Sequence, residues 1–420
     1  MKKTESRRGV VRVSKRICMG VGMFLGIVLL TSGIGTAQQT GAVPGVTSDK
    51  IKLGLFCAFT GPIAHYGKTE HLAEAIYDQV NKMGGIHGRK IEWVSEDDGC
   101  EPIKGIAAVK KLIHQDKVFA LHGAMCSNVA LAIKKEVLEA GIPYMNLAAA
   151  SYKITSPLEK NIFSGIYTSI VLAHSMADFA MSKPGAKRVA VIKHTDEWGK
   201  NFYDPLIEYL TKKYNVTPVA DVTIERGVTD ATPQVLKIKQ ENPDVIIAVT
   251  YLDSTTTFLR DSFKLGLKVP IIGSPAVAVD EQFQRLGNPD AMRLFFAPYS
   301  YNYPLDHPVM LKWGALLKNL YPKDEFDMLV GNGFGGTLAI VQALKDSGRD
   351  LTREKFVAAL EKLNNFQDAI IPGYEYPMCS PVSFSPTDHV ALKSVTFSFL
   401  GKDKKLKIAK NYQEYMDKNQ

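Results

Sequence analysis

The sequence predicts an α/β protein made of two lobes, each a Rossmann-like parallel sheet covered by helices. Runs of apolar, β-branched residues alternate with stretches of helical periodicity along most of the chain, as is typical of parallel sheets with helices on both faces. The alternation starts afresh after Ser164, which indicates a second lobe of the same kind. The length of 420 residues suits two domains of roughly 100–200 residues each.

The first lobe is predicted as a regular succession of strands and helices. Its strands fall at residues 50–59, 89–98, 117–123 and 142–150, and its helices at residues 68–85, 102–115 and 129–141. The second lobe repeats the pattern, with strands at 188–196, 216–224, 244–251 and 269–274 and helices at 168–183, 202–214, 232–242 and 254–266. Helices of this length suit the crossovers between parallel strands.

The later part of the chain changes character. A Tyr- and Pro-rich segment at 295–310 predicts a crossover, a helical stretch covers 312–360, and two last strands fall at 392–400 and 405–412. We therefore expect the chain to pass between the lobes more than once and to form a hinge. The predicted first lobe comprises residues 48–166 and 299–374, and the second 167–298 and 375–420. Ligands of open α/β sheets bind at the carboxyl ends of the strands, which here would face each other across a cleft.

The N-terminus predicts a signal peptide over residues 1–37. A segment with seven basic residues precedes an uncharged apolar stretch, and small residues follow it up to Ala37, as in exported proteins. The alternative is an uncleaved membrane anchor, because the apolar stretch approaches the length that spans a membrane. No Cys that could accept a lipid follows the apolar stretch, so we expect a soluble periplasmic protein.

The charge balance gives no reason to expect a nucleic-acid partner. The formal net charge is +8, and removing residues 1–37 takes away seven basic residues and one acidic residue. The remaining chain is therefore near +2, which points neither to nucleic acid nor to an anionic membrane. No cofactor or metal is predicted, because the sequence has no CxxC pair, no HExxH and no cluster of His residues.

Two motifs have ordinary structural explanations. The segment GNGFGG (residues 331–336) only loosely resembles a dinucleotide-binding loop, because its spacing is wrong and the residues before it make a poor strand. Small residues that let a helix pack closely are the better interpretation. The acidic turn SEDDGCE (residues 95–101) is compatible with cation binding, but such turns are commonly just solvated.

The segment HGAMCSNVAL (residues 122–131) is the main candidate for function. Cys126 and Ser127 stand where a strand gives way to a helix. Cys126 would suit a nucleophile, whereas Ser127 and the free N–H groups at a helix start would suit a carboxylate; a plain N-cap is the alternative for Ser127. Cys100 lies 26 positions earlier, and both cysteines follow strands that we expect to be neighbours, so a disulfide worth roughly 3–4 kcal/mol is a further possibility. That bond would remove Cys126 as a nucleophile.

The chain resembles the periplasmic binding proteins of branched-chain amino-acid ABC transporters. The likeness covers nearly all of the chain after the signal peptide. It rests on AFTGPIAHYGK, VNKMGGIHGRKIEWV, DDGCEP, GAMCSNVA, AGIPYMNLAAAS, HTDEWGKN, ENPDVIIAVTY, LRDSFKLGL and VSFSPTDH, in this order. The resemblance implies a type I periplasmic-binding-protein fold, with two lobes joined by three crossovers that close on a ligand, and a Cys100–Cys126 disulfide.

The resemblance also implies roles for individual residues. Ser127 matches the residue that holds the ligand carboxylate, and Ala148 a position whose backbone contacts the ligand amine. Tyr66 matches an aromatic wall of the first lobe, and Trp198 and Tyr251 match aromatic positions of the second. The other residues that we expect in the ligand site are Asn128, Ala149, Ala150, Ser151, Asp253 and Pro275.

Two departures from the family pattern affect the expected ligand. Ala150 stands where the family commonly has a Thr, and Ser151 is the nearby substitute. Pro275 stands where the second lobe usually offers a Glu to the ligand ammonium. An unpaired buried ammonium costs several kcal/mol, so Asp253 or Glu375 would have to replace that Glu. Otherwise the ligand is an aromatic or aliphatic acid without an amine; both classes remain open.

The sequence therefore predicts a monomeric solute-binding protein that delivers a small carboxylate to an ABC permease and performs no catalysis. Two alternatives remain. One is a ligand-binding sensor module of the same fold. The other is a hydrolase that uses Cys126 or Cys57 as its nucleophile. The pairing of Cys57 and Cys379 stays open.

Overall fold

The computed structural model describes residues 43–61, 64–327, 329–374 and 378–419. The predicted signal peptide lies outside the described residues, and so does Glu375. None of the helices within the described ranges is both long and apolar enough to cross a membrane.

The first sheet has five parallel strands in the order β2-β1-β3-β4-β5. The strands are β1 (Lys50–Cys57), β2 (Lys90–Asp97), β3 (Ala120–Gly123), β4 (Tyr144–Asn146) and β5 (Ile162–Ser164). Its helices are α1 (Lys68–Lys82), α2 (Pro102–His114), α3 (Ser127–Ala132) and α4 (Lys134–Ala140). Successive strand residues face opposite layers: Leu55 joins the core that contains α1, whereas Phe56 joins the core that contains α2 to α4. The sheet is therefore buried on both faces, as predicted.

The second sheet has seven strands in the order β12-β11-β10-β9-β8-β6-β7. The strands are β6 (Val189–Lys193), β7 (Ala220–Thr223), β8 (Val245–Val249), β9 (Ile271–Gly273), β10 (Phe295–Tyr299), β11 (Thr396–Leu400) and β12 (Leu406–Ala409). Its helices are α5 (Ser169–Met181), α6 (Glu197–Tyr214), α7 (Thr232–Gln240), α8 (Leu252–Lys264), α9 (Val279–Leu286) and α13 (Tyr412–Lys418). The strands β6 to β10 are parallel to one another, and β11 and β12 add two antiparallel strands at one edge of the sheet.

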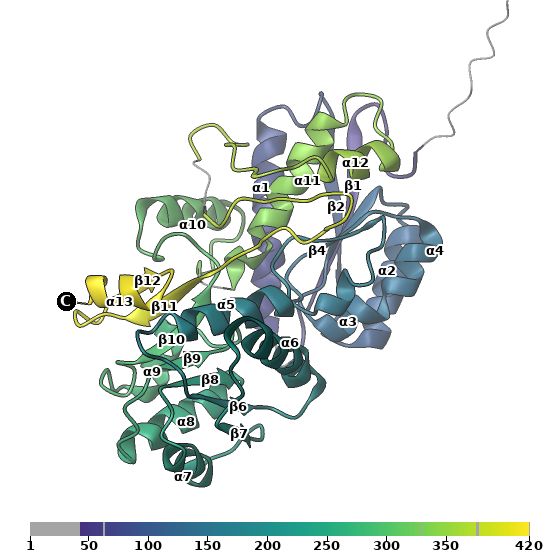
Figure 1. The fold of residues 1–420 in the computed structure, drawn as a ribbon. Coiled ribbons are helices and arrows are strands. Elements are labelled where there is room, and N and C mark those ends of the chain that lie inside the picture. Colours follow the sequence, from purple (N-terminus) through teal and green to yellow (C-terminus); the bar gives the residue numbers. More distant parts are fainter. Residues whose placement is uncertain (1–42, 62–63, 328, 375–377, 420) are drawn as a thin grey trace, which may run out of the picture. The chain divides into compact units, whose positions relative to one another are not determined.

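The chain returns to the first sheet after β10. The helices α10 (Pro308–Leu320), α11 (Phe334–Asp346) and α12 (Arg353–Leu360) follow, with a short 3-10 turn η3 (Val330–Gly333) between the first two. Figure 1 shows α11 beside α1, and α12 packs against α11, although more than 250 residues separate α11 from α1 in sequence. The predicted alternation of strands and helices around two sheets is confirmed.

Four features differ from the sequence-based expectation. The predicted helix at 129–141 breaks at Ile133 into α3 and α4, and the stretch 312–360 divides into three helices. The predicted crossover at 295–310 begins with a fully buried strand, β10. The short elements β5, α9 and α13 were not predicted, because three to eight residues give too little periodicity.

The segment before β11 packs on the first sheet. Val390 forms a parallel bridge to Ser164 at the end of β5. His389 stacks on Phe163, with ring centroids 3.8 Å apart, and its Nδ1 lies 2.9 Å from the Ile162 carbonyl oxygen. The predicted lobe boundaries stay a prediction, but these contacts favour assigning residues 378–392 to the first lobe.

Candidate functional site

The candidate site lies at the carboxyl ends of the strands, where loops carry the predicted residues. In the first lobe, Tyr66 follows β1, Ser127 follows β3, and residues 148–151 follow β4. In the second lobe, Trp198 follows β6 and Tyr251 follows β8. Because neighbouring parallel strands end at one edge, each lobe gathers its own set of residues there.

Ser127 and Ser151 form a pair of hydroxyl groups in the first lobe. Ser127 is the first residue of α3, and its Oγ accepts a hydrogen bond of 3.3 Å from the Ser151 backbone N–H. Ser151 is buried, and its own Oγ has no hydrogen-bond partner among the described residues. A buried hydroxyl without a partner is costly, and a bound carboxylate oxygen would satisfy it.

The loop after β4 is held by its own backbone and by Asn146. The Asn146 side chain accepts from the Ala149 N–H at 3.2 Å and donates to the Ala149 carbonyl at 2.7 Å. The Ala148 N–H donates to the Ala124 carbonyl, and the Ala150 carbonyl accepts from the Ser169 N–H. An ammonium donates hydrogen bonds, so the predicted contact with an amine would be accepted by the carbonyl oxygen of Ala148.

The Cys100–Cys126 disulfide is present, with Cα atoms 5.6 Å apart. The expectation that the strands preceding these cysteines are neighbours is wrong, because β1 lies between β2 and β3. The bond instead passes over the end of β1. Cys100 adopts a left-handed backbone conformation with φ of 60°, and its N–H donates to Asp98 Oδ1 at 2.7 Å, which stabilises this turn.

Asn128 supports the disulfide loop. Its Nδ2 donates to the Cys100 carbonyl at 3.1 Å, and its Oδ1 accepts from the Val129 N–H at 2.9 Å. These contacts describe a structural role for Asn128, whereas its contact with a ligand stays a prediction.

In the second lobe, Trp198 and Tyr251 stack on each other with ring centroids 4.3 Å apart. The start of α6 places Trp198, because Asp196 Oδ1 caps the helix through the Gly199 N–H at 2.8 Å. A Cβ atom at Gly199 would lie 2.2 Å from the His194 carbonyl oxygen. Glycine therefore lets α6 begin directly against the end of β6.

Arg226, which sequence analysis did not single out, covers the Tyr251 ring. Its Cζ lies 4.0 Å from the ring centroid, and its Nη2 donates to the Tyr251 hydroxyl. Asp196 Oδ2 accepts from the same Nη2 at 2.6 Å. The sequence signal for Arg226 was its position just after the predicted strand at 216–224, which places it at the carboxyl ends of the strands.

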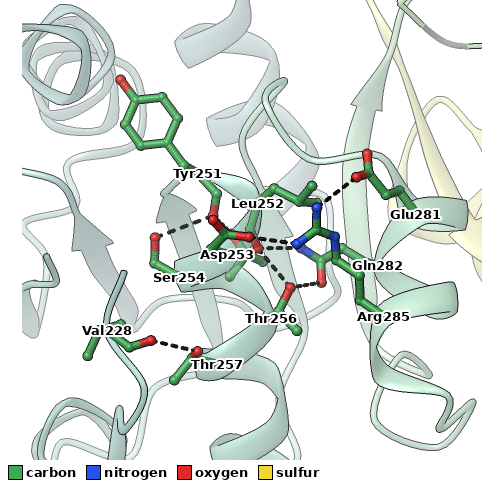
Figure 2. A network of polar contacts seen from close by, with 11 residues as sticks. Val228, Tyr251, Leu252, Asp253, Ser254, Thr256, Thr257, Glu281, Gln282 and Arg285 are labelled. Atoms are coloured by element: carbon green, nitrogen blue, oxygen red, sulfur yellow. Dashed lines mark hydrogen bonds and ion pairs between the residues drawn. The ribbon is translucent and has the colours of Figure 1, made fainter. Parts of the chain in front are cut away.

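Asp253 is paired within the second lobe. Its Oδ1 accepts from Arg285 Nη1 at 2.6 Å, and Arg285 Nη2 donates to Glu281 at 3.1 Å. Figure 2 shows the Asp253 carboxylate turned toward Arg285 and the Tyr251 ring pointing the other way. Pro275 follows β9 and offers no charge. The alternative acid, Glu375, lies outside the described residues.

Asp280 is a second residue that sequence analysis missed. It stands in the first turn of α9, and its Oδ1 is buried without a partner among the described residues. Burial raises the pKa of Asp280, and the charges of Asp327 and Glu281 raise it further. The short helix α9 was not predicted from the sequence, so no position in the fold could be assigned to the acidic residues of its first turn.

Tyr66 comes within electrostatic range of the second lobe. It belongs to the 3-10 turn η1 (Ala64–Gly67). Burial raises the pKa of Tyr66 most, and the Glu281 charge adds to the rise. Glu281 belongs to α9, so this interaction brings a first-lobe aromatic residue near the second lobe.

Cys57 and Cys379 are both buried, and neither forms a disulfide among the described residues. Burial raises the pKa of Cys57 well above its usual range, and the Glu70 charge adds to this. A thiol in that state is a poor nucleophile, and Cys126 is held in the disulfide. These observations weigh against the predicted hydrolase alternative.

Comparisons with known proteins agree with the two-lobed fold. The family described as "Periplasmic binding protein" matches residues 50–404. The Leu/Ile/Val/Thr-binding protein of Salmonella typhimurium is 28% identical over 232 residues, which cover 55% of this chain and 63% of that protein. The match thus spans less than two thirds of this curated relative.

Solved structures share the fold at lower identity. The branched-chain amino acid transporter substrate binding protein of Streptococcus pneumoniae, in complex with isoleucine, has a TM-score of 0.68 and 19% identity, covering 86% of this chain and 99% of its own. A solute binding protein from R. palustris, in complex with 4-hydroxybenzoate, has a TM-score of 0.69 and 23% identity, covering 86% and 96%. These likenesses support the fold.

Proposed function

The chain belongs to the periplasmic binding protein family, and from that premise we propose that it captures a small carboxylate and delivers it to an ABC permease. The observation that supports this most directly is the pair formed by Ser127 and Ser151. One hydroxyl is fixed at the start of α3, and the other is buried without a partner. Such a pair can hold a carboxylate with charge-assisted hydrogen bonds.

The ligand would bind between the two strand-end groups of residues. A closed form is then stabilised because the ligand contacts both lobes. Micromolar affinity needs only about 8 kcal/mol, which two hydroxyl contacts and an apolar body can supply. We place the protein in the periplasm, on the strength of the predicted signal peptide and of family membership.

The relatives bind different classes of carboxylate. One solved structure holds isoleucine and another holds 4-hydroxybenzoate, so family membership leaves the amino-acid and non-amino-acid classes open. Both share the carboxylate, which is the part of the ligand that we assign to Ser127 and Ser151.

The test is a thermal-shift screen of the protein lacking residues 1–37 against amino acids, aromatic acids and short-chain acids, followed by calorimetry. A bound ligand raises the melting temperature by mass action. We expect at least one carboxylate to bind, and Ser127→Ala and Ser151→Ala each to weaken it by about tenfold or more, since a hydrogen bond to a charged group contributes roughly 1.5–3 kcal/mol. Ser175→Ala is the control, because the Ser175 hydroxyl donates to the Val171 carbonyl of its own helix.

A screen in which only uncharged compounds bind would contradict the proposal. So would carboxylate binding that both serine variants leave unchanged. Delivery to a permease is tested separately: deleting the gene should abolish high-affinity uptake of the identified ligand, and adjacent genes should encode permease and ATPase subunits.

A further inference from the structure

Arg226 is a fixed cation at the strand-end edge of the second lobe. Its Nε and Nη2 both donate to Asp196 Oδ2, at 3.2 and 2.6 Å. Its Nη2 also donates to the Tyr251 hydroxyl, and its guanidinium lies over the Tyr251 ring. A guanidinium pinned by an acid and an aromatic ring has lost most of its rotamer freedom before any ligand arrives.

The guanidinium keeps donors to offer. Arginine has five N–H donors, and three of them are engaged with Asp196 and Tyr251. The two N–H donors on Nη1 have no hydrogen bond within the described parts of the chain, and 65% of the side chain is exposed. A preorganised guanidinium with two free donors suits an anionic oxygen pair, because little ordering remains to be done on binding.

Two of the acids near the Tyr251 ring are paired with arginines. Asp196 pairs with Arg226, and Asp253 pairs with Arg285. Pro275, in the loop after β9, offers no charge. A ligand ammonium at the Tyr251 ring would meet the Arg226 guanidinium in direct contact with that ring, whereas the neighbouring acid Glu225 acts there through its charge on His194.

We propose that Arg226 makes this site selective for ligands that carry a second acidic group at the end opposite the carboxylate held by Ser127. This inference rests on the proposed function and names its ligand class. The ligand is an aromatic or aliphatic dicarboxylate whose far end binds Arg226, with Trp198 and Tyr251 beside its apolar body.

Asp280 offers the competing possibility, because its unpartnered oxygen could receive an ammonium. The charges that act on Asp280 are those of Asp327 and Glu281, and the Asp280 charge acts in turn on Tyr299. No interaction joins Asp280 to Trp198 or Tyr251 among the described residues. Arg226 is the group in direct contact with the aromatic wall.

The experiment measures binding of two matched series to the protein lacking residues 1–37. One series is benzoate, benzene-1,4-dicarboxylate and 4-(aminomethyl)benzoate; the other is hexanoate, adipate and 6-aminohexanoate. We expect the dicarboxylate of at least one series to bind at least tenfold tighter than its partners. Arg226→Gln should remove that advantage while leaving the monocarboxylate within about twofold, and Arg226→Lys should retain only part of it.

The matched control is Arg188→Gln. Arg188 stands just before β6, at the amino ends of the parallel strands of the same sheet, where it donates to the carbonyls of Glu241 and Asn242. This variant loses the same charge and should leave every affinity unchanged. Equal losses in the Arg188 and Arg226 variants would show a general charge effect and overturn the proposal.

Other outcomes separate this inference from the proposed function. If an ammonium-bearing probe binds tightest and Asp280→Asn abolishes that preference, the inference fails and the transport proposal stands. The same holds if monocarboxylates bind as well as dicarboxylates, or if Arg226→Gln weakens both equally. If no probe binds and no carboxylate in the wider screen does, both proposals fail.

Discussion

The Cys100–Cys126 disulfide joins the loops after β2 and β3 across the end of β1. It anchors the first residue of α3, because Ser127 follows Cys126 directly. Asn128 adds a hydrogen bond to the Cys100 carbonyl. The hydroxyl that we assign to the ligand is therefore placed by covalent chemistry as much as by the helix.

We expect the Cys100→Ser/Cys126→Ser double variant to lose roughly 3–4 kcal/mol of unfolding free energy. The disulfide closes a loop with a sequence separation of 26 residues, and in the chain-entropy model such a constraint destabilises the unfolded state by about that amount. Urea denaturation of the protein lacking residues 1–37 measures the loss.

The control is a reductant. Dithiothreitol should lower the urea midpoint of the unmodified protein and leave the double variant unaffected. In the unreduced, unfolded protein lacking residues 1–37, two thiols should react with Ellman's reagent, those of Cys57 and Cys379. A count of four, or a midpoint that reductant does not change, would show that the bond does not form in solution.

The order of elements was predictable from the sequence because long buried helices and strands carry strong periodicity. The strand order was not. Nothing in the residues around Cys100 and Cys126 indicates that β1 is inserted between their strands, because the order of parallel strands depends on how whole crossovers pack. The disulfide expectation was right although the geometric reason given for it was wrong.

Asp98 should make stability depend on pH. Burial raises its pKa to about 6, against the opposing hydrogen bond from the Cys100 N–H. The pKa of an Asp in the unfolded chain is about 3.9. Between pH values of about 3.9 and about 6, Asp98 is therefore protonated in the native state and ionised in the unfolded state. The free energy of unfolding accordingly falls as the pH rises to about 6. Asp98→Asn cannot ionise and keeps the oxygen that faces Cys100. Relative to the unmodified protein, it should gain up to ~3 kcal/mol between pH 4 and 7.

The quantity to measure is the difference in unfolding free energy between Asp98→Asn and the unmodified protein. The pH dependence of the unmodified protein alone also contains the effect of His122, which has the opposite sign. Burial lowers the pKa of His122 to about 3, so the stability that depends on neutral His122 is lost as the pH falls. Asp97→Asn provides a control of opposite sign. Burial raises the pKa of Asp97, but hydrogen bonds from Thr60 and backbone N–H groups outweigh it and lower the pKa overall. Because the pKa of Asp97 lies below its ordinary value, the stability that ionised Asp97 contributes is lost only as the pH falls below about 4. Urea unfolding at pH 4, 5.5 and 7 should therefore show an Asp98→Asn advantage that grows with pH beside a nearly constant Asp97→Asn difference. An Asp98→Asn advantage that does not grow with pH would contradict the assignment.

The position of a candidate residue at a strand end was predictable only where a motif contained it. Ser127, Trp198 and Tyr251 follow strands and belong to quoted segments, and each lies at a strand-end edge. Arg226 and Asp280 escaped because a charged residue in a loop has no periodicity and gains significance only from its neighbours. The Arg226 guanidinium becomes a candidate only once it is seen over the Tyr251 ring.

For Gly336→Ala, helix propensity predicts a more stable protein, whereas close packing against Gly165 predicts a less stable one. Gly336 lies in α11, where replacing Gly by Ala normally stabilises a helix by roughly 0.5–1 kcal/mol. Here a Cβ atom would lie 2.8 Å from the Cα of Gly165, a backbone atom that cannot turn away. We therefore expect Gly336→Ala to destabilise the protein by about 1–3 kcal/mol, the usual cost of overpacking.

The same measurement tests the interpretation of the GNGFGG segment as a close-packing motif. Urea denaturation at pH 7 shows directly whether the unfolding free energy rises or falls. Ala339→Gly is the reference variant: it makes the reverse exchange at a buried position of the same helix that does not contact Gly165. A stabilised Gly336→Ala variant would show that α11 and the loop after β5 are farther apart in solution than the structure has them, and the close-packing interpretation would then lose its basis.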